Sequence, residues 1–354
     1  MSERRCPKCG TVYTDTARFC ARDGNMLVEV QAKTPAPPGP SAPGTAARTP
    51  SKPKLGLERA SSLSGHVLDS RYQVQKKLGE GGMSFVYLAR EVATGQDVAI
   101  KVLSPKLATD RSSVERLRRE AGLAMRLDHP NVCRILRLGE SEDGLIYLVM
   151  PFLKGELLSD REVKAGPMPV APGIAVLRQV CAGLHHAHEL QIVHRDLKPE
   201  NIMLVTDEPA GDRAVVMDFG LAKERRADPA IAKLTATGII LGTPEFMSPE
   251  QIRGKQLDAR SDIYALGIVA FEMFTGKLPF HGRNAQEMMI ARLRGRPLKL
   301  RQLRPDLPDG LERTLGRALE SNPEARYTTA LEFADALSTF HEGGLLSKIK
   351  ERLK

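Results

Sequence analysis

Two short segments of the sequence carry side chains that together could transfer a phosphoryl group. The first is HRDLKPEN at residues 194 to 201, and the second is DFG at residues 218 to 220. In-line phosphoryl transfer needs an acceptor for the proton of the attacking hydroxyl, a cation near the transferred group, and oxygen ligands for Mg²⁺. The residues that supply these groups are Asp196, Lys198, Asn201 and Asp218. The sequence therefore predicts a site for magnesium-dependent phosphoryl transfer.

A glycine-rich stretch and a lysine lie upstream of these segments. GEGGMSFV covers residues 79 to 86 between two strand-like runs, where glycines let backbone N–H groups approach phosphates without hindrance from Cβ atoms. A mere tight turn would have the same composition. VAIK ends at Lys101 in an apolar strand, and burying a lysine unpaired costs several kcal/mol. Glu120 is its natural partner, and the pair could reach the α- and β-phosphates of a nucleotide; a surface lysine with an unrelated glutamate is the alternative.

The pattern around these residues predicts two lobes. From Tyr72 onward the strand-like runs are RYQVQKKLG, FVYLAREV, QDVAIKVL, RILRLGE and LIYLVMPFL. Between the third and fourth, SSVERLRREAGLAMRL has the apolar spacing of an amphipathic helix. After Gly155 the pattern is mainly helical, with two short strand-like runs around residues 201 to 218. A small β-rich lobe followed by a mostly helical lobe is expected.

Residues 72 to about 340 resemble a complete protein kinase domain, of the eukaryotic-like Ser/Thr type found in bacteria. The motifs quoted above occur in that family's order and approximate spacing. The resemblance implies an α+β, bilobal kinase fold over residues 65–341. Its N-lobe (about 72–150) would hold a five-stranded sheet and the helix αC, and its C-lobe (about 151–341) would be mainly helical. It also implies ATP and Mg²⁺, with Mn²⁺ as an alternative metal, and protein substrates phosphorylated on Ser or Thr.

The same resemblance implies the roles of individual residues. Asp196 would be the catalytic base, Lys198 would neutralise the moving phosphoryl group, and Lys101 would pair with Glu120. Asn201 and Asp218 would hold Mg²⁺. The implied ATP-binding residues are Leu78, Gly79, Glu80, Gly81, Gly82, Met83, Ser84, Phe85, Val86, Ala99, Lys101, Met150, Leu153 and Met203. Among them Met150 resembles the gatekeeper, and Leu153 would offer its backbone to adenine.

Specificity for Ser/Thr is suggested by Lys198, two residues after Asp196, and by Thr243 in GTPEFMSPE. The resemblance implies that Glu250 pairs with Arg326 to anchor this segment, and that SDIYALG belongs to the central helix under the catalytic loop. Ser84 at the third glycine position, Pro151 after the gatekeeper and SPE in place of APE depart from the family pattern. None of these departures removes a catalytic group, which argues against a pseudokinase acting as a scaffold.

Regulation by phosphorylation is a further expectation. Arg195 directly precedes Asp196, as in kinases whose activation loop is ordered by phosphate. A phosphate on Thr235 or Thr237 could pair with Arg195 and other basic side chains. Two ordinary solvated threonines are the alternative. Autophosphorylation between two molecules, through a transient kinase–kinase dimer, is predicted for this loop.

The N-terminus carries a different kind of motif. CPKCG at residues 6–10 and CARDG at residues 20–24 have the design of zinc-ribbon knuckles. The expected Zn²⁺ ligands in the module of residues 1–30 are Cys6, Cys9, Cys20 and Asp23, where Asp23 stands in place of a fourth Cys. A degenerate ribbon without metal is the alternative. Residues 31–64 are rich in Pro, Ala, Gly, Ser and Thr and are predicted to be a disordered linker.

Composition and charge limit the partners and the cellular location to be expected. The net charge is +9, but 52 basic and 43 acidic residues are interspersed, so no specific nucleic acid partner is expected and a zinc-ribbon nucleic-acid-binding regulator is disfavoured. Five Cys are too few for a disulfide framework, and no apolar run suggests a transmembrane segment, so a cytoplasmic location is expected. Residues 342–354 read as a basic, solvated helix or tail, with membrane-surface attachment as the alternative. The histidines of LHHAHEL, at residues 184–190, are expected to be packing or surface residues.

Overall fold

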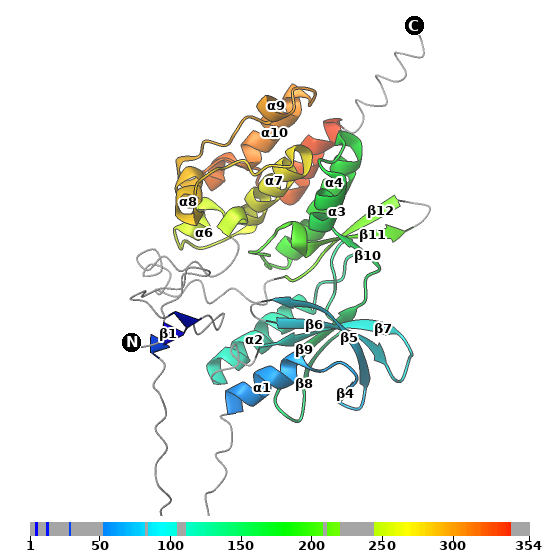
Figure 1. Ribbon diagram of the computed structural model, residues 1–354. Helices are drawn as coiled ribbons and strands as arrows, with labels where there is room; N and C mark the ends of the chain where they lie inside the picture. Colours follow the sequence, from blue (N-terminus) through cyan, green and yellow to red (C-terminus); the bar gives the residue numbers. More distant parts are fainter. Residues whose placement is uncertain are drawn as a thin grey trace, which may run out of the picture. The chain divides into compact units, whose positions relative to one another are not determined.

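The computed structural model describes residues 52–81, 84–104, 111–207, 211–219 and 244–340, and three short strands at residues 4–5, 12–13 and 28–29. The chain forms two compact units, Met1–Thr49 and Pro50–Lys354. The helices and the two larger sheets drawn in Figure 1 belong to the second unit. Among the described residues no helix is both long and apolar enough to cross a membrane.

An antiparallel sheet forms the N-lobe, and its strands run in the order β4-β5-β6-β7-β9-β8. The strands are β4 (Val67–Leu68), β5 (Tyr72–Gly81), β6 (Ser84–Glu91), β7 (Asp97–Leu103), β8 (Arg137–Glu140) and β9 (Ile146–Pro151). The five expected strands are confirmed, and β4 adds a short sixth at one edge. The expected helix is α2 (Arg111–Ala124), which lies against this lobe in Figure 1.

Both faces of this sheet are covered by apolar side chains. Along β9, Leu148 and Met150 pack with Ala121 and Ala124 of α2. The alternate residues, such as Tyr147, belong to a separate cluster on the other side. This alternation follows from the two-residue period of a strand, so the sheet needs a second cover opposite α2.

That second cover includes α1 (Lys52–Ser61), and it corrects the predicted linker. Ala60 and Leu63 are fully buried in the same cluster as Tyr147, and the Tyr87 hydroxyl donates to the carbonyl of Ala60 at 2.8 Å. The prediction of disorder over 31–64 is therefore wrong for residues 52–64, which form α1 and the segment that follows it. The segment has few apolar side chains, and they are small or of medium size. They are nevertheless enough to pack this segment against the N-lobe sheet. The rest of the predicted linker, residues 31–51, lies outside the described residues.

The C-lobe is mainly helical, as expected. Its helices are α3 (Leu158–Ala165), α4 (Val170–Glu189), α6 (Pro249–Ile252), α7 (Ala259–Thr275), α8 (Ala285–Arg294), α9 (Leu300–Leu303) and α10 (Asp309–Ala318), and residues 330–340 are also helical. Short 3-10 turns are η2 (Pro199–Asn201), η4 (Pro244–Phe246) and η5 (Pro323–Ala325). A small sheet in the order β10-β11-β12 contains β10 (Gly155–Leu157), β11 (Ile202–Asp207) and β12 (Gly211–Val216).

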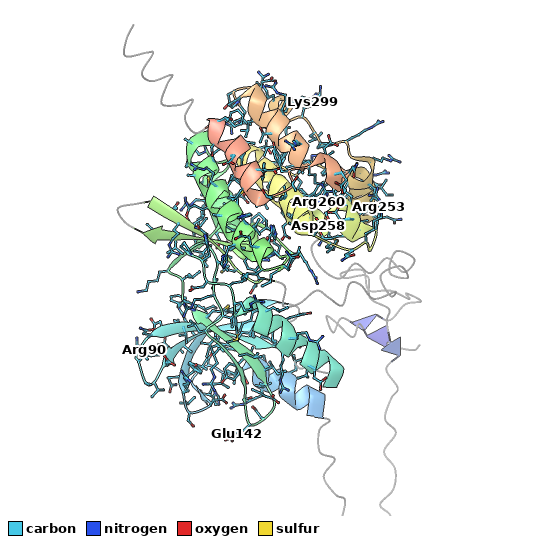
Figure 2. All side chains as sticks on the ribbon, turned by 180° about the vertical axis from the view of Figure 1, so that it is seen from behind. Arg90, Glu142, Arg253, Asp258, Arg260 and Lys299 are labelled. Carbon is cyan, nitrogen blue, oxygen red and sulfur yellow. The ribbon has the colours of Figure 1, made fainter. Side chains whose placement is uncertain are left out.

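Helix α7 is the centre of this lobe, because almost all of its residues are buried. Asp258 starts it as the N-cap and accepts the backbone N–H of Arg260 at 2.9 Å; Figure 2 shows the two side chains next to each other. Gly276 ends it in the left-handed conformation at φ +69°. Gly267 lets α10 approach closely, since a Cβ atom there would lie 3.1 Å from that of Ala318.

The predicted pair between Glu250 and Arg326 is confirmed. Two bonds of 2.7 and 2.8 Å join the guanidinium to the carboxylate, and Ser261 donates to the same carboxylate at 2.7 Å. Burial alone would raise the pKa of Glu250, but the hydrogen bonds and charge of Arg326 outweigh it and lower that pKa. This bidentate pair ties α6 to α7 and to the C-terminal part of the lobe.

The N-terminal unit contains a small antiparallel sheet in the order β2-β1-β3. Its strands are β1 (Arg4–Arg5), β2 (Val12–Tyr13) and β3 (Val28–Glu29). The predicted zinc ligands, Cys6, Cys9, Cys20 and Asp23, lie outside the described residues, as does the predicted tail at 342–354.

Candidate active site

The segment HRDLKPEN is held from below by one carboxylate of α7. Asp262 accepts the backbone N–H of His194 at 2.8 Å and that of Arg195 at 2.9 Å. Its oxygen Oδ2 also lies 2.8 Å from Nε2 of His188 on α4. Arg195 has φ +67°, a left-handed conformation that non-glycine residues rarely adopt. The bond to Asp262 helps to hold Arg195 there, and so determines how the chain enters Asp196.

Asp262 is ionised in this arrangement. Burial alone would raise the pKa of Asp262, but the hydrogen bond and charge of His188, together with His194, lower it below the ordinary value. An ionised carboxylate accepts several hydrogen bonds without donating any. A charged, buried carboxylate that accepts two backbone N–H groups is therefore the support of the loop.

Hydrogen bonds also join this loop to the segment before DFG. The amide nitrogen of Asn201 donates to the carbonyl of Asp196 at 2.8 Å, and the backbone N–H of Met217 donates to the carbonyl of Asn201 at 2.8 Å. Ring nitrogen Nε2 of His194 lies 2.8 Å from the carbonyl of Met217. His194 also packs edge-on against Phe219, with ring centroids 4.7 Å apart. Asp196 and Asn201 are thereby brought close to Asp218 and Phe219 of DFG.

Lys101 of the N-lobe contacts the DFG segment of the C-lobe. Its ammonium lies 2.7 Å from Oδ1 of Asp218, and the lysine side chain is only 12% exposed. Burial would raise the pKa of Asp218, but the charge and hydrogen bond of Lys101, with His194 and Lys198, lower it. The ion pair that the structure shows for Lys101 is thus with Asp218. The predicted pair with Glu120, a partly buried residue of α2, stays a prediction.

Most of the predicted nucleotide-binding residues lie on strands around the pair of Lys101 and Asp218. Leu78, Gly79, Glu80 and Gly81 end β5, and Ser84, Phe85 and Val86 begin β6, which pairs with it. On β7, Lys101 lies opposite Val86, and Ala99 lies opposite Met150 of β9. Leu153 follows β9, Met203 lies on β11, and Gly82 and Met83 are outside the described residues.

A small cavity of about 10 Å³ lies next to Met150, between the two lobes' contributions from α2, β9 and DFG. It is lined by Ala124, Leu127, Cys133, Ile135, Met150, Asp218 and Phe219. Burial, with the nearby charge of Asp218, raises the pKa of the Cys133 thiol to about 12, so this thiol stays neutral. The lining shows that α2, β9 and the residues Asp218 and Phe219 of DFG meet at this cavity.

Sequence reasoning missed the role of His188. It took the histidines of α4 for packing or surface residues, yet His188 is a partner of Asp262. The available signal was its position, because it follows Cys181 and Leu184 on the buried face of α4. A histidine on a buried face needs a polar partner.

A group of four glutamates beside the loop was also missed. It comprises Glu162 of α3, Glu200 of η2, Glu245 of η4 and Glu272 of α7. Burial first, and then the charges of Glu272 and Glu200, raise the pKa of Glu162 to about 8. Burial, with Glu200 and Glu245, raises the pKa of Glu272 to about 7. These residues come from four separate elements, so no local sequence pattern predicts that they lie near one another.

A family model for the protein kinase domain matches residues 72–338. The chain belongs to the protein kinase domain family. This membership agrees with the two lobes, with the loop held by Asp262, and with the pair of Glu250 and Arg326. The family uses ATP and a divalent metal ion, and the amide and carboxylate oxygens of Asn201 and Asp218 are hard ligands suited to Mg²⁺.

Several characterised proteins are similar to this kinase domain. Serine/threonine-protein kinase pkn2 of Myxococcus xanthus is 40% identical over 277 residues, which are 78% of this chain and 33% of that protein. Serine/threonine-protein kinase PrkC of Bacillus subtilis is 36% identical over 286 residues, 81% of this chain and 43% of that protein. The crystal structure of the Mycobacterium tuberculosis PknI kinase domain has TM-score 0.61 and 29% identity, covering 78% of this chain and 98% of that one. The chain thus spans about a third to a half of the length of curated relatives it matches.

The raised pKa of Glu162 predicts a specific pH dependence of the kinase domain's stability. An unfolded glutamate ionises near its ordinary pKa of 4.5, whereas folded Glu162 keeps its proton up to about pH 8. The unfolded state therefore binds fewer protons between these values, and stability falls as pH rises through them. Glu162→Gln should remove this loss, so its melting temperature should exceed that of wild type at pH 8 and the difference should shrink toward pH 5.

Thermal unfolding of both proteins at several pH values measures the effect. Glu142→Gln makes the same chemical change at an exposed glutamate of the β8–β9 turn, labelled in Figure 2, and should leave the profile unchanged. Parallel profiles for wild type and Glu162→Gln would contradict the assignment.

Proposed function

We propose that this chain is a serine/threonine protein kinase that transfers the γ-phosphoryl group of ATP to Ser or Thr hydroxyls of proteins. The observation that carries the proposal is that side chains from both lobes meet at one site. The loop of Asp196 and Asn201 is bonded to the segment before DFG, and Lys101 reaches Asp218 from the other lobe at 2.7 Å. Relatives that carry the name serine/threonine-protein kinase support the same choice of acceptor.

The chemistry assigned to the chain's residues is mostly positioning and electrostatics. Asp196 accepts or orients the proton of the substrate hydroxyl, and Lys198 stabilises charge on the transferred group. Lys101 binds the phosphates of ATP. Asn201 and Asp218 would hold Mg²⁺, which when bound neutralises phosphate charge and orients the γ-phosphoryl group.

Loss of Asp196 should abolish transfer without unfolding the protein. Asp196→Asn keeps the shape of the side chain but cannot accept the proton, so the rate should fall by about 100-fold or more. The measurement is transfer of label from γ-labelled ATP to a generic basic protein. Asp128→Asn makes the same change at a side chain that is 83% exposed, and should keep wild-type activity. Binding of ATP with no transfer by the wild-type protein would instead indicate a pseudokinase.

We further propose that Thr235 and Thr237 are autophosphorylated between two molecules. The support is Arg195, whose guanidinium belongs to the loop that a phosphate in this region would stabilise. Mixing wild type with the Asp196→Asn protein, distinguished by mass, should place phosphate on Thr235 or Thr237 of the inactive partner. Peptide mass analysis that finds no phosphate on residues 233–243 of either protein would reject this proposal.

We also propose that residues 1–30 form a zinc-binding module. The strand order β2-β1-β3 supports it, because Cys6 and Cys9 connect β1 to β2 and the second motif connects β2 to β3. Three thiolates and the carboxylate of Asp23 suit tetrahedral Zn²⁺. Elemental analysis of purified protein should find about one zinc per chain, lost in Cys20→Ser and kept in Cys133→Ser, since a module this small depends on its metal. Protein free of zinc after purification without chelators would exclude this role.

A further inference from the structure

Helix α6 begins with a reciprocal pair of hydrogen bonds. Ser248 is the N-cap, and its hydroxyl accepts the backbone N–H of Gln251 at 3.4 Å. The backbone N–H of Ser248 donates to Oε1 of Gln251 at 2.8 Å. This capping box holds the Gln251 side chain against the start of its own helix. The amide nitrogen of Gln251 is then directed away from the capping contact.

That amide nitrogen reaches the catalytic loop. It donates to the carbonyl oxygen of Arg195 at 2.7 Å, across 56 positions of the sequence. Arg195 is the residue with φ +67°, and its N–H is bound by Asp262 at 2.9 Å. Both backbone polar groups of this strained residue are therefore held, one from α7 and the other from α6.

The carbonyl that Gln251 binds belongs to the peptide unit that joins Arg195 to Asp196. On the other side of this unit, the N–H of Asp196 donates to Nδ1 of His194 at 3.3 Å. The orientation of a peptide plane sets the direction in which the next side chain leaves the backbone. The Gln251 amide thus acts on the direction of the Asp196 carboxylate without touching substrate.

We propose that Gln251 is a positioning residue for phosphoryl transfer, which holds the Arg195–Asp196 peptide and links the start of α6 to the catalytic loop. This inference rests on the proposed function, in which Asp196 receives the substrate proton. It assigns to α6 a role beyond its anchor to Arg326. Only Met247 and the N-cap Ser248 separate η4 from α6, so in this proposal Gln251 couples that segment to the Asp196 peptide.

The variant Gln251→Glu isolates the contact. The new carboxylate keeps an oxygen for the N–H of Ser248, so the capping box remains, but it presents an oxygen to the Arg195 carbonyl and cannot donate when ionised. Positioning acts on the transition state, so kcat should fall by about tenfold while KM for ATP changes by less than about twofold. A glutamate ionises at about pH 4.3, so the new carboxyl cannot donate at any pH of a neutral assay and the loss of kcat should be present throughout that range.

Ser248→Ala is the matched control. It removes the capping hydroxyl but leaves the Gln251 amide free to bind Arg195, so its kcat should stay near that of wild type. An unchanged kcat in Gln251→Glu would overturn the inference, and so would an equal loss of kcat in Ser248→Ala or a loss that appears in KM for ATP rather than in kcat. Asp196→Asn, measured in parallel, separates this result from failure of the proposed function, because full activity in Asp196→Asn would reject the site itself.

Discussion

The conformation of the active site depends on one buried carboxylate, that of Asp262. It accepts two consecutive backbone N–H groups of the catalytic loop and contacts His188 of the neighbouring helix. Its own position is fixed because α7 is buried along nearly its whole length. The loop therefore takes its geometry from the core of the C-lobe. This explains how Arg195 can remain in a left-handed conformation that its side-chain type disfavours.

The site is completed by a charge from the other lobe. Lys101 lies on β7, whose neighbours β6 and β9 are paired with it along most of its length. The strand thus presents the ammonium from a rigid support, and the ammonium meets the carboxylate of Asp218. Because Asp218 also feels the charges of His194 and Lys198, its pKa is lowered despite burial. The ionised carboxylate is the form of Asp218 that can bind a divalent cation.

Much of this arrangement could be predicted from the sequence, and the remainder could not for a physical reason. The motifs with Asp196 and Asp218, the five strands of the N-lobe, and the pair of Glu250 and Arg326 follow from residue types in a known order. Helix α1 was missed because its few apolar residues are informative only once the sheet face that buries them is known. Gln251 was missed because its partner is a backbone carbonyl, which carries no signature in the sequence.

Two kinds of buried glutamate give the C-lobe different properties. Glu250 is paired with Arg326, and its lowered pKa means that the pair holds α6 at any pH near neutrality. Glu162 and Glu272 face other carboxylates, and their raised pKa values lie near neutrality. The first arrangement fixes a segment, because breaking it would leave a buried charge. The second makes the surroundings of the catalytic loop sensitive to pH, since burial, together with the charges of neighbouring glutamates, raises the pKa of Glu162 to about 8 and that of Glu272 to about 7.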